Sequence, residues 1–222
     1  MKRHAPSIAA AYAVTAALLL TACGGSDGES TSADSGKVAG AGAGGGASAS
    51  PTASASASAV SAERPEIELP SDLTYTFDWP KTKDTDKDAV LSDSKQFIKA
   101  VDMAIAEQDP LNAAYLFYSE GEAAAGSEEF IQEFVDYKDR ITGAKRYFDA
   151  KVNVNGDGTA GLVYCEDQSK AYNKSLTTGK TNVTVASKDS YVLYSSRLRV
   201  DEQGIWITET LTSQRGSSIC QS

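Results

Sequence analysis

The side chains that could do chemistry in this chain are carboxylates and phenols, because other reactive groups are scarce. The sequence has 222 residues with a single histidine, His4, and three cysteines. A carboxylate can act as a general base and a nearby phenol as a proton donor, so acidic residues and tyrosines of the C-terminal part are candidates for proton transfer. The candidates are Tyr147, Asp149, Tyr164, Asp167, Tyr172 and Tyr194.

A general base of this kind needs a desolvated pocket that raises its pKa. Asp149 falls on the polar side of an alternating stretch, beside Lys145 and Lys151. We therefore expect a solvated sheet face at this position and assign no catalytic residue. Arg197 and Arg199 share one face of a later stretch and could bind an anion, although a charged outer face is the expected arrangement.

Metal and cofactor sites have little support in the sequence. The histidine lies at the extreme N-terminus, and removal of that end would exclude Ser-His-Asp, Cys-His and His-ligated metal chemistry. Residues 153–158 imitate the first half of a calcium loop, but Tyr164 stands where a bidentate glutamate is required. We predict a hairpin turn there, with no metal and no cofactor. The formal net charge of −9 argues against a nucleic-acid partner.

Residues 1–22 have the organisation of a signal peptide. Lys2 and Arg3 precede an uncharged run at residues 8–20, which is too short to span a hydrocarbon core of roughly 30 Å. Residues 20–23, Leu-Thr-Ala-Cys, resemble the lipobox of bacterial lipoproteins. The resemblance implies acylation of Cys23, cleavage before it, and anchoring to the extracytoplasmic face of the cell membrane. A plain secretory signal and an uncleaved anchor are the alternatives.

The segment that follows is predicted to be a tether. Residues 24–62 are mostly Gly, Ala and Ser and contain no aromatic residue. Such a segment cannot bury enough apolar surface to offset its conformational entropy, so we expect residues 23–62 to form a lipidated cysteine with a disordered tether. A glycosylated stalk is the alternative to an unmodified spacer. Residues 63–222 then form a single domain.

This domain is predicted to have an α+β fold, with N-terminal helices packed on a curved antiparallel sheet of about four strands. Apolar residues first recur at helical spacing and later alternate with polar ones. Ser127 is the expected N-cap of the third helix and Gly143 its end, after a break at residues 121–126. The predicted helices start near residues 86, 110 and 127, and the predicted strands are 73–77, 147–154, 160–166, 191–200 and 205–213.

Over about residues 70–222 the chain resembles a group of actinobacterial lipoproteins with an Ala/Gly/Ser stalk and no assigned activity. The residues that carry this resemblance are 77–80 (FDWP), 116–119 (LFYS), 141–143 (ITG), 162–172 (LVYCEDQSKAY), 188–194 (KDSYVLY) and the tail 215–220. The order of elements is similar to the cone fold of nuclear transport factor 2-like and SnoaL-like proteins. This fold hosts enzymes, ligand binders and interaction modules alike.

Two cysteines remain once Cys23 is acylated. Cys165 and Cys220 form an even pair in an exported protein, which predicts a disulfide. The alternative is a buried Cys165 with a free Cys220.

The expected interior decides between two functions. We expect apolar side chains to fill the cone, leaving no cavity or a small one without a buried carboxylate. The domain is then a non-enzymatic module that binds a protein or small-molecule ligand. The alternative is a small isomerase-, cyclase- or dehydratase-like enzyme, which a cavity of several hundred Å³ with Asp149 or Asp167 beside a tyrosine would favour. The expected core residues are Phe97, Val101, Ile105, Phe130, Ile131, Phe134, Phe148, Val152, Leu162 and Val192.

Overall fold

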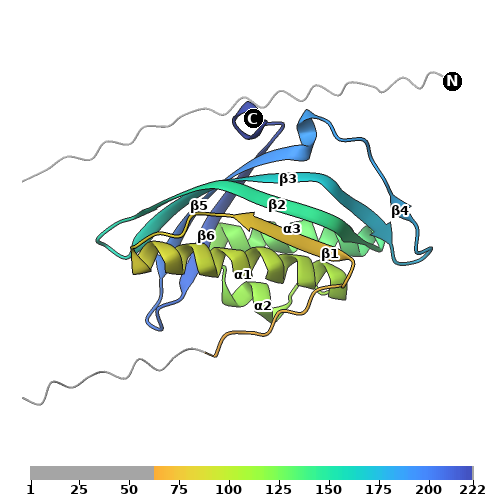
Figure 1. The fold of residues 1–222 in the computed structure, drawn as a ribbon. Helices are drawn as coiled ribbons and strands as arrows, with labels where there is room; N and C mark the ends of the chain where they lie inside the picture. Colours follow the sequence, from red (N-terminus) through yellow and green to blue (C-terminus); the bar gives the residue numbers. More distant parts are fainter. Residues whose placement is uncertain (1–62, 222) are drawn as a thin grey trace, which may run out of the picture. The chain divides into compact units, whose positions relative to one another are not determined.

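The computed structural model describes residues 63–221, in which three α-helices cover one face of a curved sheet (Figure 1). The helices are α1 (Thr85–Glu107), α2 (Ala113–Phe117) and α3 (Gly121–Tyr137). The predicted α+β class with helices preceding the sheet is confirmed. None of the helices within residues 63–221 has both the length and the apolar character needed to span a bilayer. The predicted signal peptide, the lipidation at Cys23 and the tether lie outside the described residues.

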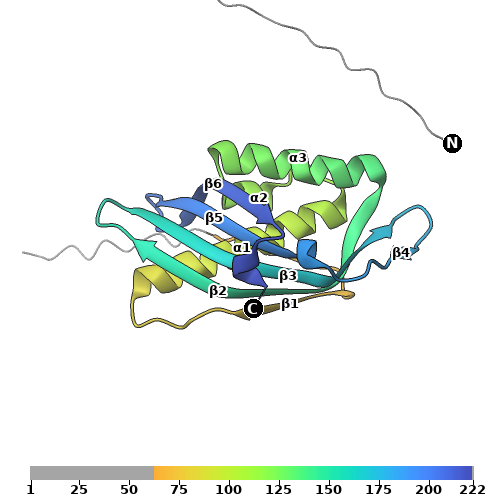
Figure 2. The same ribbon diagram turned by 90° about the horizontal axis from the view of Figure 1, so that it is seen from above.

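The sheet is mixed, with the strand order β1-β2-β3-β5-β6. An antiparallel meander runs through β2 (Asp139–Val154), β3 (Thr159–Ser175), β5 (Tyr191–Val200) and β6 (Trp206–Arg215). The predicted strand at 73–77 is the edge strand β1 (Leu73–Asp78), and it pairs in parallel with β2, so the sheet is not antiparallel throughout as expected. Strand β4 (Thr181–Asn182) pairs with the far end of β3, away from the β2–β3 hairpin (Figure 2). Short 3₁₀ turns, η1 (Lys188–Ser190) and η2 (Ser218–Cys220), flank β5 and β6.

The first two helices begin at caps other than the predicted ones. Asp84 caps α1, because its carboxylate accepts hydrogen bonds from the backbone amides of Asp86 (3.0 Å) and Lys87 (3.2 Å). Asn112 caps α2 by accepting from the amide of Ala114 at 2.9 Å. The expected start of α2 at Pro110 is therefore wrong, and this proline lies in the turn before the helix.

Helix α3 is longer at its start and shorter at its end than predicted. It begins at Gly121, and Ser127 lies inside it, where the Ser127 hydroxyl donates to the carbonyl of Ala123 at 2.7 Å. The alanines at 123–125 favour helix enough to outweigh two glycines. The helix ends at Tyr137, while Gly143 lies in β2 with a φ of +102°. A Cβ at Gly143 would come 2.1 Å from the carbonyl oxygen of Lys170, so the β2–β3 contact requires glycine here.

A β-bulge in β2 changes which side chains face the helices. The register with β3 shifts between Phe148 and Lys151, and Asp149 adopts a left-handed backbone with a φ of 53°. Tyr147 and Ala150 consequently share the helix-facing side, while Phe148 lies on the opposite side. The predicted alternation, which placed Phe148 with Val152 on the core side, is wrong because it assumed a regular strand.

The helix-facing side of the sheet carries two hydrophobic clusters. One is centred on Ile105, Tyr115 and Ile131 beneath the helices, and the other on Trp79 and Leu162 near the β2–β3 hairpin. Most of the predicted core residues belong to these clusters or pack against them. Phe130 is an exception, since 43% of its surface is exposed on α3.

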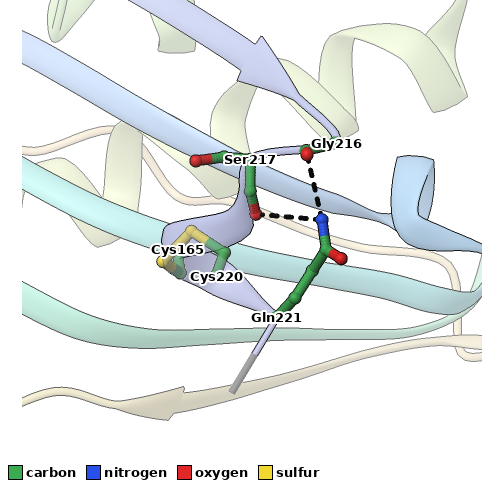
Figure 3. The surroundings of a disulfide bond; sticks show 5 residues. All are labelled: Cys165, Gly216, Ser217, Cys220 and Gln221. Atoms are coloured by element: carbon green, nitrogen blue, oxygen red, sulfur yellow. Dashed lines mark hydrogen bonds between the residues drawn. A yellow bond between two sulfur atoms is a disulfide. The ribbon is translucent and has the colours of Figure 1, made fainter.

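The C-terminal tail packs on part of the opposite face of the sheet, around Phe148 and Cys165. Cys165 of β3 is bonded to Cys220 of η2, which confirms the predicted disulfide (Figure 3). The side-chain amide of Gln221 donates to the carbonyls of Gly216 (2.9 Å) and Ser217 (3.2 Å) and holds the tail in its turn. The disulfide spans a sequence separation of 55 residues, which corresponds to about 4 kcal/mol of stabilisation in the chain-entropy model.

Candidate functional site

A cavity of about 710 Å³ lies between the helices and the sheet. This volume falls within the usual range of small-molecule sites. The expectation of a filled interior is wrong, because α3 presents small residues to this space and the sheet presents polar ones. The helix-side lining includes Phe97, Ile98, Val101, Ala123, Gly126, Ser127, Phe130 and Phe134, and the sheet-side lining includes Lys145, Tyr147, Tyr164, Glu166, Val192, Tyr194 and Arg215.

An ion-pair network of three buried residues contributes to the cavity wall. The Lys145 ammonium lies 3.0 Å and 2.9 Å from the two carboxylate oxygens of Asp102, and 3.5 Å from Oε1 of Glu166. Lys145, Asp102 and Glu166 are 8%, 2% and 2% exposed. They come from β2, α1 and β3, so the network links the helix layer to the centre of the sheet.

Three tyrosines donate their phenolic protons to this network. Tyr75 donates to Oδ2 of Asp102 at 2.5 Å. Tyr147 donates to Oε1 of Glu166 at 3.1 Å, and Tyr194 donates to Oε2 at 2.9 Å. Every oxygen of the two carboxylates therefore accepts at least one hydrogen bond.

The charge state of the network follows from burial and from these contacts. Burial lowers the pKa of Lys145, but attraction to Asp102 and Glu166 outweighs it, so this pKa is raised above its ordinary value. Burial and the neighbouring Glu166 charge raise the pKa of Tyr147 and of Tyr194 well above the usual range. The network thus contains an ammonium group and neutral phenols at neutral pH.

Tyr164 is a buried polar residue of the cavity wall whose hydroxyl has no partner in the described chain. It is 3% exposed and lines the cavity, yet within residues 63–221 its hydroxyl makes no hydrogen bond. Its ring stacks on that of Tyr194, with 5.1 Å between centroids and 16° between planes. Burial, followed by the charge of Glu166, raises the pKa of Tyr164, so its hydroxyl keeps its proton and can donate it to a bound molecule.

The outer part of the cavity lies between α3 and the segment around η1. Glu122 of α3, Asp189 of η1 and Arg215 of β6 contribute the charged groups there. The Arg215 guanidinium donates to the backbone carbonyl of Asp189 at 2.9 Å. Phe130 and Val185 add exposed apolar side chains to this part of the lining.

The structure brings together some of the sequence-predicted candidates and separates others. Tyr147, Tyr164, Tyr172 and Tyr194 all line the cavity. The two predicted carboxylates do not line it. Asp149 is exposed at the bulge, as its polar position in the sequence suggested, and Asp167 accepts a hydrogen bond from the amide of Ser169 at 2.9 Å.

The carboxylates that do line the cavity, Asp102 and Glu166, were missed together with Lys145. A signal for two of them was present in the sequence. Asp102 lies four residues after Ile98 on the apolar face of α1, and Glu166 lies four residues after Leu162 on the core side of β3. Lys145 carried no comparable signal, because its side depends on the register of β2.

The remaining sequence motifs have structural explanations. Residues 155–158 form the predicted β2–β3 hairpin turn, in which Asp157 accepts from the amide of Thr159 at 3.1 Å. Arg197 pairs with Glu209 at 3.0 Å, and Arg199 pairs with Glu120 at 2.8 Å, so carboxylates of this chain already occupy both guanidinium groups. Across residues 63–221 there is no group of three or more His, Cys, Asp or Glu side chains placed to hold a metal ion.

Comparison with known proteins gives distant structural similarity. No family model and no curated protein matches the chain. Among solved structures, the intermembrane-space region of the chloroplast protein ARC6 aligns with 61% of this chain and 99% of its own length, at 13% identity and a TM-score of 0.37. A Shewanella frigidimarina protein with the provisional assignment of ketosteroid isomerase aligns over 57% of this chain and 94% of its own, at 12% identity and a TM-score of 0.31.

Proposed function

We propose that this protein is a lipid-anchored extracytoplasmic protein whose folded domain binds a small organic molecule between α1, α3 and the sheet. We also propose that the domain belongs to the nuclear transport factor 2-like cone folds. The order of three helices before a long, bent meander supports this assignment. The observation that carries the binding proposal is the cavity of about 710 Å³ with the Asp102–Lys145–Glu166 network in its wall.

The geometry favours binding over catalysis. Both oxygens of Glu166 hold phenol donors, and both oxygens of Asp102 lie within 3.0 Å of the Lys145 ammonium. A general base must offer a lone pair to the substrate proton. Each of these oxygens already accepts from a donor of the chain, which favours the charged form and lowers its basicity, and only part of its acceptor capacity is left, at Oε2 of Glu166 for example. Such a network suits a rigid wall that orients a ligand.

Binding can be tested with the neutral fluorescent probe N-phenyl-1-naphthylamine and the full chain. The variant Gly126→Trp should block the cavity, because a Cβ at Gly126, on the cavity side of α3, meets no atom within 4 Å. The matched control is Ala125→Trp, an exposed neighbour on the same helix that does not line the cavity. We expect probe fluorescence to be enhanced by the wild type and by Ala125→Trp, and to be lost in Gly126→Trp. Equal fluorescence in both variants would contradict binding in this cavity.

The anchoring part of the proposal rests on the sequence at residues 20–23. Cys23→Ala removes the thiol that would be acylated, and no other cysteine lies near the apolar run. We expect the wild type to incorporate a labelled fatty-acid analogue in a bacterial host and the variant to stay unlabelled and uncleaved. Labelling of the Cys23→Ala variant would refute lipidation at this residue.

A proton-transfer enzyme is the second candidate, favoured by one specific observation. Glu166 lies in the cavity with Tyr147, Tyr164 and Tyr194, which is a carboxylate beside phenols as such chemistry requires. Incubation with 2-tetralone in D₂O, followed by NMR, measures proton exchange next to a carbonyl. Exchange that is accelerated by the wild type and lost in Glu166→Gln would establish this alternative over simple binding.

A further inference from the structure

The charges around the cavity constrain the ligand, if the proposed binding function holds. Four carboxylates contribute to the lining, from Asp102, Glu122, Glu166 and Asp189, against two cations, Lys145 and Arg215. An excess of one sign along a cleft raises the local concentration of ligands of the opposite sign.

The buried part of this charge is not balanced within the domain. Lys145 is the single cation in contact with both Asp102 and Glu166 among the described residues. Two acidic side chains thus share one basic side chain in a nearly solvent-free position. Buried charge without a counter-charge is costly, so a ligand that brings one positive charge gains more here than a neutral ligand.

Glu166 offers a place for such a charge. Its Oε2 accepts from Tyr194 and has no second donor within residues 63–221, whereas Oε1 receives both Tyr147 and Lys145. A carboxylate oxygen can accept two hydrogen bonds, so Oε2 has one acceptor position left.

Aromatic faces and an unpartnered phenol lie beside this position. Tyr164 and Tyr194 stack with 5.1 Å between their centroids, and π-faces attract cations. The Tyr164 side chain is largely buried and lines the cavity, and its hydroxyl has no hydrogen-bond partner in the described chain, which is an observation independent of the acidic groups. It indicates a polar ligand atom at the same end of the cavity.

We propose that the ligand is an organic cation, a protonated amine on an apolar body. The ammonium lies at Oε2 of Glu166 beside the Tyr164 and Tyr194 rings, and the body packs against Phe97, Val101 and Phe134 on the helix side. An anionic ligand is disfavoured beside Glu166, because the cation there, Lys145, is already paired with both acids.

The test uses three probes that share one indole body: tryptamine as the cation, tryptophol as the neutral analogue and indole-3-propionate as the anion. Calorimetry with the full chain should show tryptamine binding about tenfold more tightly than tryptophol, with indole-3-propionate the weakest. In Glu166→Gln, which keeps the shape and removes the charge, the preference for tryptamine should fall to about twofold or less. Tyr164→Phe tests the hydroxyl and should weaken tryptamine and tryptophol alike.

The outcomes separate this inference from the proposed binding function. Equal or tighter binding of tryptophol or indole-3-propionate, blocked by Gly126→Trp, would overturn the cation preference and leave the binding site intact. A tryptamine preference that persists in Glu166→Gln would also overturn it. Two results together would overturn both the cation preference and the binding function. None of the three indole probes would bind, and Gly126→Trp and Ala125→Trp would enhance the fluorescence of the naphthylamine probe equally. Circular dichroism spectra of the variants verify that each is folded.

Discussion

Lys145 joins the two acidic side chains of the cavity wall. Its ammonium is buried between Asp102 and Glu166 and is the counter-charge that these acids contact within the described residues. Desolvation of two carboxylates is costly, and the attraction of the ammonium offsets part of that cost. A buried network of this kind also fixes the position of α1 against β2 and β3.

We expect Lys145→Met to lower the free energy of unfolding by about 3 kcal/mol or more, because it leaves two buried acidic side chains without their basic partner. Lys87→Met on α1 is the control, since the Lys87 ion pair with Asp84 is long, at 3.8 Å, and partly exposed. That pair should contribute less than about 1 kcal/mol. Urea unfolding measures both values, and a loss in Lys145→Met no larger than in Lys87→Met would contradict the role of the network.

At the scale of elements, the bulge in β2 determines the chemistry of the cavity. It shifts the phase of the alternation, so that Tyr147 shares the helix-facing side with Ala150, and Phe148 packs on the other face with the Cys165–Cys220 disulfide. Bulges also bend strands and increase their twist, which suits the curvature of this sheet. The backbone of Asp149 carries the necessary left-handed conformation.

The stability of variants at Asp149 should therefore depend on how readily the new residue adopts a left-handed backbone conformation. Asp149→Gly should leave stability unchanged or raise it by up to about 1 kcal/mol, while the β-branched Asp149→Val should lower it by about 1–2 kcal/mol. Lys151→Val is the control in the same strand, as it is exposed and extended, and should change stability by less than about 0.5 kcal/mol. Thermal unfolding followed by circular dichroism gives the ranking, and equal stability of Asp149→Val and Asp149→Gly would be inconsistent with the bulge.

For the whole molecule, several buried groups hold their protons more tightly in the folded chain than in the unfolded one. The pKa values of Lys145, Tyr147, Tyr164 and Tyr194 are all raised, the tyrosines chiefly by burial and Lys145 by its carboxylate partners, which outweigh burial. A raised folded-state pKa gives stability that is fully present below the unfolded value and is lost as the pH rises. The unfolded values of lysine and tyrosine are about 10.

We therefore expect the free energy of unfolding to be nearly constant between about pH 7 and 9 and to fall above about pH 10, by about 1.4 kcal/mol per pH unit for each such group. Tyr194→Phe removes one group and should make the decline shallower. Tyr137→Phe, at an exposed position on α3 outside the network, should leave the slope unchanged. Denaturant unfolding across this pH range tests the prediction, and a wild-type slope equal to that of Tyr194→Phe would argue against it.

The sequence by itself determined the elements and their order. Helical spacing predicted α1, alternation and the Asn-Gly-Asp-Gly turn predicted the β2–β3 hairpin, and the pair Cys165 and Cys220 predicted the disulfide. These signals are local, or depend on counting one residue type. The features they indicate can therefore be predicted without knowledge of the tertiary structure. The phenols of the cavity, Tyr164 and Tyr194 among them, were candidates by residue type alone, and the sequence left the face of Tyr194 open.

Only the tertiary structure decided that the interior is open and acidic. Asp102 and Lys145 are 43 residues apart and meet because α1 packs against β2. Which face Tyr147 and Phe148 occupy depends on the register shift opposite β3, and a shift of one residue exchanges the two faces of a strand. Burying a polar side chain costs free energy unless it has a partner. The sequence does not show that partner, because it comes from another element of the fold.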